Sequence, residues 1–192
     1  SKPLKIKTVN LAKPQKNEVL IKIRAIGLCH SDLSVINGTR PRPMPMVLGH
    51  EAAGEIIELG EDVRDFDLGD HVVCTFIPSC GKCDYCSEGR PALCEQGAAS
   101  NEKGDMLAGG RRFEGDETIY HHLGVSGFAE HAVVSTNSLV KVDKSIPFEQ
   151  LAVFGCAVIT GVGAVINTAN ISVGSTVAIV GLGGMVPIVL LA

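Results

Sequence analysis

The chain has 192 residues, of which 45% are hydrophobic, so it can bury a core of its own and fits one domain of ordinary size or one domain plus a fragment. Its 17 lysines and arginines are outnumbered by 21 aspartates and glutamates, and the net charge of -4 offers no basic footprint for nucleic acid or an acidic membrane, so neither partner is expected. The seven cysteines form an odd set, with no N-terminal signal sequence and no uninterrupted run of about 18 apolar residues. These features argue against a disulfide framework and predict a reduced, cytoplasmic protein.

Short strands are predicted along most of the chain. Between Val19 and Ala25 every second residue is apolar and lies on one face, which is typical of a half-buried strand. The proline-rich loop that follows can form neither helix nor central strand. Further strands are predicted at 52–60, 71–76, 128–135 and 139–142, and the polar, glycine-rich residues 95–118 are expected to form an irregular surface segment. This spacing of strands predicts a partly open β-barrel up to about residue 143.

The period of the pattern changes after residue 143. Ser145 and Pro147 mark a helix start, and residues 147–169 are predicted to be helical in two pieces with Cys156 between them. Residues 176–184, TVAIVGLGG, are expected to form an apolar strand that opens into glycines, as at the start of an α/β unit. The glycine fingerprint of a dinucleotide site is incomplete there, because Val186 stands where a third glycine is needed.

The most specific motif is a set of four cysteines in the stretch CGKCDYCSEGRPALC. Their spacing can fold four sulfurs around one ion, and zinc takes four thiolates in a closed tetrahedral site. An iron–sulfur cluster is the main alternative, but a ferredoxin-type run needs its fourth cysteine three residues on, followed by proline. We therefore predict a zinc site that stabilises the fold, with the ligands Cys80, Cys83, Cys86 and Cys94.

Three further candidates, Cys29, His50 and Cys156, are far apart in the sequence. Each stands where predicted regular structure gives way, and functional side chains concentrate at such points. Taken singly, a buried cysteine is more often a small core residue than a ligand, and a lone histidine is more often a satisfied polar residue. Periodicity and spacing alone do not join the three.

Six motifs occur in the order found in the zinc-dependent medium-chain alcohol dehydrogenases, and the chain resembles that family over nearly its whole length. They are CHSD at 29–32, GHE at 49–51, GD at 69–70, the four cysteines at 80–94, GC at 155–156 with Thr160 after it, and GLGG at 181–184. The resemblance implies a GroES-like, partly open β-barrel catalytic domain at 1–157, with the structural-zinc lobe at 80–94. It further implies that 158–192 are the linking helix and first strand of a truncated Rossmann dinucleotide-binding domain.

The resemblance also implies a catalytic zinc held by Cys29, His50 and Cys156, which makes two zinc ions per chain. Glu51 would lie beside this metal, and Asp32 would accept a hydrogen bond from the second ring nitrogen of His50. The zinc would act as a Lewis acid on the alcohol oxygen while hydride passes to the nicotinamide.

The remaining site residues follow from the same resemblance. Ser31 would pass the alcohol proton outward; Ser34 stands where several members have a histidine, which leaves solvent or His30 as the final base. His30 also matches a position that often touches the cofactor. Matches to substrate-pocket positions are Phe76, His122 and Leu123, and matches to cofactor positions are Thr160, Gly181, Gly183 and Gly184.

The implied function is that of an oxidoreductase that transfers hydride between a primary alcohol (aliphatic, allylic or aromatic) and NAD, with NADP also open. The implied assembly is a homo-oligomer, a dimer or tetramer. Two alternatives stay open: a member like the glutathione-dependent formaldehyde dehydrogenases, and a catalytically silent zinc-binding fragment. A zinc ribbon that recruits DNA has only the four cysteines in its favour and the charge balance against it.

Overall fold

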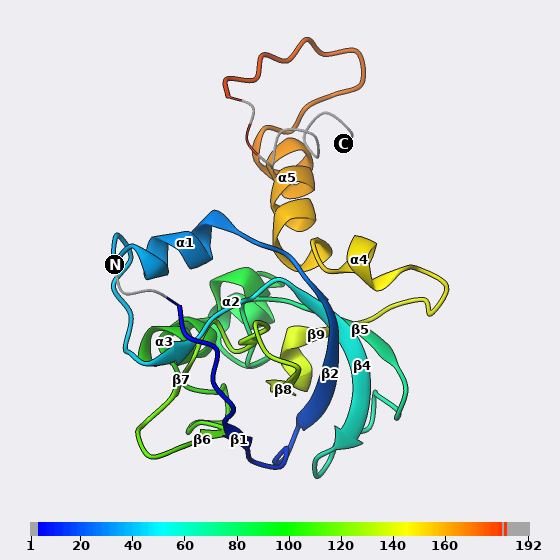
Figure 1. The fold of residues 1–192 in the computed structure, drawn as a ribbon. Helices are drawn as coiled ribbons and strands as arrows, with labels where there is room; N and C mark the ends of the chain where they lie inside the picture. Colours follow the sequence, from blue (N-terminus) through cyan, green and yellow to red (C-terminus); the bar gives the residue numbers. More distant parts are fainter. Residues whose placement is uncertain (1–3, 182, 184–192) are drawn as a thin grey trace.

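The computed structural model describes residues 4–181 and 183, and it is built around one curled antiparallel sheet (Figure 1). Five strands lie in the order β8-β2-β4-β5-β9, so that β8 and β9 form its edges. Their bounds are Glu18–Ile26 (β2), Ala52–Leu59 (β4), His71–Cys74 (β5), His131–Ser135 (β8) and Leu139–Lys141 (β9). The predicted partly open barrel is confirmed.

Two small strand pairs accompany this sheet. The strands β1 (Asn10–Leu11) and β6 (Phe113–Glu114) pair antiparallel, whereas β3 (Met46–Val47) and β7 (Tyr120–His121) pair parallel. The proline-rich loop thus contributes two residues to an edge pair, which is where a strand beside prolines can form. This pair places His50 shortly after β3 and His122 directly after β7.

The core lies inside the curl of the sheet. Along β2, Val19 and Ile21 are fully buried while Lys22 is exposed, as the period-2 pattern predicts. The buried cluster consists of Val19, Ile21, Ala52, Ile56, Val72, Cys74, Val125, Ala132, Val134 and Leu139. A smaller cluster forms on the other face, where the helix α4 (Phe148–Leu151) packs against β2 and β4.

The expectation of an irregular segment at 95–118 is wrong in its first part, because Glu95–Lys103 form the helix α3. The sulfur of Cys94 caps its first turn and Gly104, at φ 69°, ends it in the left-handed conformation. Its buried residues are Gly97, Ser100 and Asn101. Since this face packs through small and amide side chains, the helix lacks the apolar period by which it could have been recognised.

The C-terminal helical run begins at α4, and its later part around α5 projects away from the sheet (Figure 1). It continues through the π-helical turn η3 (Phe154–Val158), α5 (Ile159–Gly163) and the π-helical turn η4 (Ala164–Thr168). The predicted helical run is confirmed, but the predicted break at Cys156 is wrong, because Cys156 lies within the helical turn η3. By length and composition alone Phe148–Thr168 could cross a membrane, but a core helix of a soluble protein passes the same test.

The expected strand at 176–180 is not formed. These residues have no regular secondary structure, and no strand in the described part of the chain pairs with them. A strand of a parallel sheet takes its hydrogen bonds from neighbouring strands, so an apolar β-branched sequence does not form one by itself. Val186 lies outside the described residues.

Three short helical elements complete the fold. They are α1 (His30–Ile36), which follows β2, and α2 (Asp84–Ser87) and the 3-10 turn η1 (Pro91–Leu93), which lie within the lobe. The sequence pattern does not predict α1, because seven residues are too few to show a helical period.

Candidate functional site

The four cysteines of the lobe converge. The Sγ atoms of Cys80, Cys83, Cys86 and Cys94 all lie within 4.8 Å of one another. Backbone amides of Cys80 and Gly97 donate to the Cys94 sulfur over 3.2 and 3.3 Å. Burial opposes ionisation, but these amides hold the pKa of the Cys94 thiol below its ordinary value. A lowered thiol pKa favours the thiolate, which is the form that binds a metal. Burial, followed by the neighbouring Cys83 thiol, raises the pKa of Cys86 to about 11. The convergence of the four sulfurs is therefore what fits a four-thiolate zinc site.

A second cluster joins residues that are distant in sequence. One ligand atom from each of Cys29, His50, Glu51 and Cys156 lies within 4.8 Å of the others. His50 and Glu51 are buried, while the two cysteines are half-buried. The structure therefore brings together the scattered trio, with Glu51 beside it.

Local structure positions each thiol of this cluster. Cys29 lies three residues after the end of β2 and caps α1, where its sulfur accepts a hydrogen bond from the Ser31 amide over 3.5 Å. Cys156 lies in the π turn η3, a kind of turn that is frequent at functional sites. Gly155 lets this turn approach β5, because a Cβ there would overlap the carbonyl oxygen of Cys74.

The second cluster also fits a cation by its charge. Burial, followed by the negative charges of Cys29 and Glu51, raises the pKa of the Cys156 thiol to about 12. When Cys29, Glu51 and Cys156 are ionised, their negative charges repel one another in a partly buried site. A divalent cation would offset that repulsion. Two thiolates and one imidazole are a ligand set that alcohol dehydrogenases use for catalytic zinc.

A buried carboxylate, Asp32, faces two imidazoles. Its Oδ2 lies 3.2 Å from Nδ1 of His50 and its Oδ1 lies 3.1 Å from Nδ1 of His122, while the Gly49 amide donates to Oδ1 over 2.9 Å. Burial alone would raise the pKa of Asp32, but the two imidazoles and the amide hold it far below its usual range. With Nδ1 of His50 turned to a carboxylate, its Nε2 is left for a metal.

The residues matched to a proton path lie on α1. The Ser31 hydroxyl is 3.5 Å from the Cys29 sulfur. His30 is exposed, and its Nδ1 lies 3.2 Å from the Ser34 hydroxyl. The helix thus carries one hydroxyl beside the cluster and a separate pair, Ser34 with the exposed His30.

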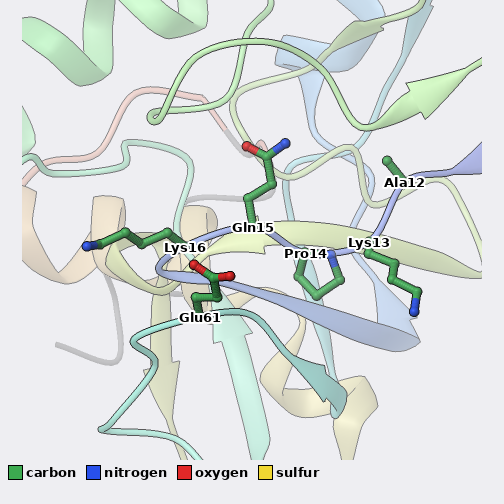
Figure 2. A pocket seen from close by; sticks show the side chains of 6 residues that line it. All are labelled: Ala12, Lys13, Pro14, Gln15, Lys16 and Glu61. Atoms are coloured by element: carbon green, nitrogen blue, oxygen red, sulfur yellow. The ribbon is translucent and has the colours of Figure 1, made fainter.

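The residues matched to a substrate pocket separate into two groups. Phe76 and Leu123 line a cavity of about 310 Å³, and the Phe76 ring packs edge-to-face on His50 with centroids 5.9 Å apart. His122 does not line this cavity, and its ring nitrogen Nδ1 instead contacts the Asp32 carboxylate. An open hollow of about 560 Å³ lies elsewhere, between residues 12–16 and Glu61, and contains none of the predicted site residues (Figure 2).

The residues matched to cofactor positions are not gathered into a site. Thr160 lies on α5, where its hydroxyl donates to the Cys156 carbonyl over 2.6 Å. Gly181 and Gly183 have no neighbouring atoms within 4 Å of where a Cβ would be. Gly184 lies outside the described residues. The cofactor assignments therefore stay predictions.

Sequence reasoning missed three features of the structure. They are the contact between His122 and Asp32, the pair Arg40 and Arg42 in the cavity wall, and the buried ion pair of Glu18 with Arg112. No local signal identifies them, because each depends on segments that are distant in sequence or on the shape of a cavity.

Comparisons with known proteins agree with this geometry. The family model described as "Alcohol dehydrogenase GroES-like domain" matches residues 15–144. The S-(hydroxymethyl)glutathione dehydrogenase of Synechocystis sp. is 43% identical over 186 residues, which are 96% of this chain and 50% of that protein. The chain therefore spans about half the length of the curated relatives it matches.

Solved structures show the same likeness. The alcohol dehydrogenase zinc-binding domain protein of Burkholderia ambifaria has a TM-score of 0.81 and 38% identity, over 86% of this chain and 45% of that one. Acetophenone reductase from Geotrichum candidum, solved in complex with NAD, has a TM-score of 0.72 and 29% identity, over 91% of this chain and 46% of that one.

Proposed function

The chain belongs to the alcohol dehydrogenase GroES-like domain family, and on that premise we propose that the protein is a zinc-dependent dehydrogenase that exchanges hydride between a primary alcohol and NAD. The observation that carries the proposal is the cluster of Cys29, His50 and Cys156, with Asp32 on the far nitrogen of His50. The relative named as a dehydrogenase and the similar reductase bound to NAD support it.

In this proposal Cys29, His50 and Cys156 hold the zinc, with Glu51 within reach. Bound there, zinc supplies Lewis acidity to the oxygen of the alcohol or carbonyl. Asp32 keeps the His50 ring in place and in one tautomer, because its carboxylate faces Nδ1. The apolar wall that includes Phe76 holds the carbon chain and excludes water.

The chain's own hydroxyls would carry the proton. The Ser31 Oγ is the polar atom on α1 beside the cluster and receives the proton of the alcohol in this scheme. At the outer side of the helix, the Ser34 Oγ and His30 Nδ1 are 3.2 Å apart, and His30 is exposed. In this scheme His30 releases the proton to solvent. It takes the role that a histidine at position 34 is expected to have in several relatives.

The four-cysteine lobe would hold a second, structural zinc. A closed set of four thiolates leaves no coordination position for a substrate, so its contribution is to stability. The proposal includes a cytoplasmic location, since six of the seven cysteines serve as metal ligands and must stay reduced.

The test separates the two sites by variants of the full-length protein. We expect two zinc ions per chain by mass spectrometry of the metals, and alcohol-dependent formation of NADH. His50→Ala should abolish turnover while the protein stays folded, whereas Cys83→Ser should release the lobe's zinc and lower the unfolding temperature. Equal stability losses with full activity in both variants would refute this division of roles.

One second candidate is favoured by a specific observation. The relative from Synechocystis is named for S-(hydroxymethyl)glutathione, so the alcohol would be the adduct of formaldehyde with glutathione. Formaldehyde with and without glutathione belongs in the substrate panel for that reason. A full-length preparation with both zinc ions and no activity on any alcohol or aldehyde would leave a silent zinc-binding protein as the better reading.

A further inference from the structure

His122 contacts the same carboxylate that faces the candidate zinc ligand His50. The Nδ1 of His122 lies 3.1 Å from Oδ1 of Asp32, and Oδ2 of that carboxylate lies 3.2 Å from Nδ1 of His50. The two imidazole rings are nearly perpendicular, with an interplanar angle of 83° and centroids 5.5 Å apart. Asp32 therefore lies between the zinc ligand and a second histidine, which has no part in the scheme above.

The Asp32 carboxylate has a nitrogen beside each of its oxygens. The Gly49 amide donates to Oδ1 over 2.9 Å, next to the contact with His122. Asp32 is only 3% exposed, and a carboxylate buried to this extent needs such donors in order to stay ionised. An ionised carboxylate only accepts hydrogen bonds, so the ring nitrogen that faces it is the one that carries the proton. The Nε2 of His122 is buried and has no hydrogen-bond partner in the described part of the chain, so no hydrogen bond on that side competes for the orientation of the ring.

The backbone of His122 is held by the turn that it begins. The His122 amide donates to the Ser126 hydroxyl over 2.9 Å, and the His122 carbonyl accepts from the amides of Val125 and Ser126, each over 3.1 Å. Leu123 and Ser126 have positive φ angles of 54° and 55°. Residues other than glycine adopt this region at an energetic cost, and such conformations cluster at functional sites. The turn thus keeps an unusual conformation that holds the His122 side chain against Asp32.

This turn is also anchored beside the segment that carries His50. Before the two histidines, β3 and β7 pair in parallel, with Val47 opposite His121. After the turn, the Gly127 amide donates to the Gly49 carbonyl over 2.9 Å. Hydrogen bonds on both sides therefore fix the spacing between the two segments that carry the histidines.

We propose that His122 is a positioning residue for the catalytic metal: by holding the Asp32 carboxylate, it fixes the orientation in which that carboxylate meets His50. The proposal rests on the dehydrogenase function above, because it needs a zinc ion bound to His50. Removing the carboxylate partner of a metal-bound histidine typically costs about 10- to 100-fold in metal affinity or activity. Since His122 acts through that carboxylate, its removal should have a smaller effect in the same direction.

The test measures the rate of metal release from the full-length protein into a chelator. Cobalt(II) is loaded in place of zinc, because its absorption depends on its ligands and so distinguishes the four-thiolate lobe from the site with two thiolates. His122→Phe keeps a ring of similar size without the Nδ1 donor, and it should speed release from the catalytic site by about three- to tenfold. Release from the lobe should not change, which makes the lobe an internal reference.

Two polar variants test whether the donor or the size of the ring matters. The amide nitrogen of an asparagine lies close to the position of Nδ1, whereas that of a glutamine lies close to the position of Nε2. His122→Asn should therefore restore most of the metal retention and His122→Gln should not. This pair also decides the proposal if His122→Phe does not fold.

A double variant tests whether His122 acts through Asp32. Asp32→Asn should speed release from the catalytic site by about 10- to 100-fold, and His122→Phe should add nothing to it. His121→Phe is the matched control, because His121 is also fully buried but bonds to the Arg112 amide instead of Asp32. It should lower the free energy of unfolding and leave release from the catalytic site unchanged.

Three results would overturn this proposal and leave the dehydrogenase function intact. They are wild-type release in His122→Phe, equally fast release in His122→Asn and His122→Gln, and effects of His122→Phe and Asp32→Asn that multiply in the double variant. A wild-type protein that binds metal only in the lobe would contradict the dehydrogenase function, and this proposal with it.

Discussion

Removing the charge of Arg112 should lower the free energy of unfolding more than removing the charge of an exposed arginine. The side chains of Arg112 and Glu18 are only 3% and 1% exposed. Two short hydrogen bonds join them, Nε to Oε2 over 2.7 Å and Nη2 to Oε1 over 2.6 Å. Gln15 accepts a third bond from the same guanidinium over 3.1 Å. The pair ties the loop before β6 to the start of β2.

The magnitude follows from what Arg112→Met leaves behind. The Glu18 carboxylate would stay buried without a counter-charge, and breaking a buried pair in this way costs about 3–5 kcal/mol of unfolding free energy. The pair Arg24–Glu55 provides a matched control, since its contact is 2.8 Å but its side chains are 40% and 30% exposed. Arg24→Met should cost only about 0.2–1 kcal/mol.

Urea unfolding of the zinc-loaded protein, followed by circular dichroism, measures both losses. The double variant Glu18→Leu with Arg112→Met should recover most of the stability, because two apolar groups of similar volume leave no charge unpaired. The reasoning is refuted if Arg112→Met destabilises no more than Arg24→Met, or if the double variant is as unstable as Arg112→Met alone.

Two further predictions concern glycine packing and a buried histidine. Gly155→Ala should destabilise by about 1–3 kcal/mol, because its Cβ would overlap the Cys74 carbonyl. The helical Gly163→Ala should instead stabilise by about 0.5–1 kcal/mol, because its Cβ would meet the Asn167 side chain at an ordinary contact distance of 3.8 Å. Thermal unfolding of the two variants measures both effects. Burial, with the charges of nearby arginines, lowers the pKa of His121 from 6.5 to about 4. Between these two pH values the unfolded chain binds a proton that the folded protein does not, so the free energy of unfolding should fall as pH drops from 6.5 toward 4. His121→Gln should make that fall less steep. The same pH dependence in the variant and the wild type would contradict this role of His121.

Local sequence was sufficient wherever structure depends on neighbours in the chain. The strand at 18–26 followed from its alternation, and the helical run after residue 147 followed from its change of period. The four-cysteine lobe could be predicted in the same way, because its ligands lie within 15 residues of one another. The polar helix α3 escaped this reasoning, since it packs through small and amide side chains.

What only the tertiary structure decided involves segments that meet across the fold. The sequence by itself determined a curled β domain and a four-cysteine site, while Cys29, His50 and Cys156 were joined at that stage only by resemblance to a family. Folding brings those three within 4.8 Å of one another, sets Asp32 against His122, and places Arg40 and Arg42 in one cavity wall. The reason is physical: periodicity reports which side of an element is buried, but the partner on that side depends on how the curled sheet and its loops come together.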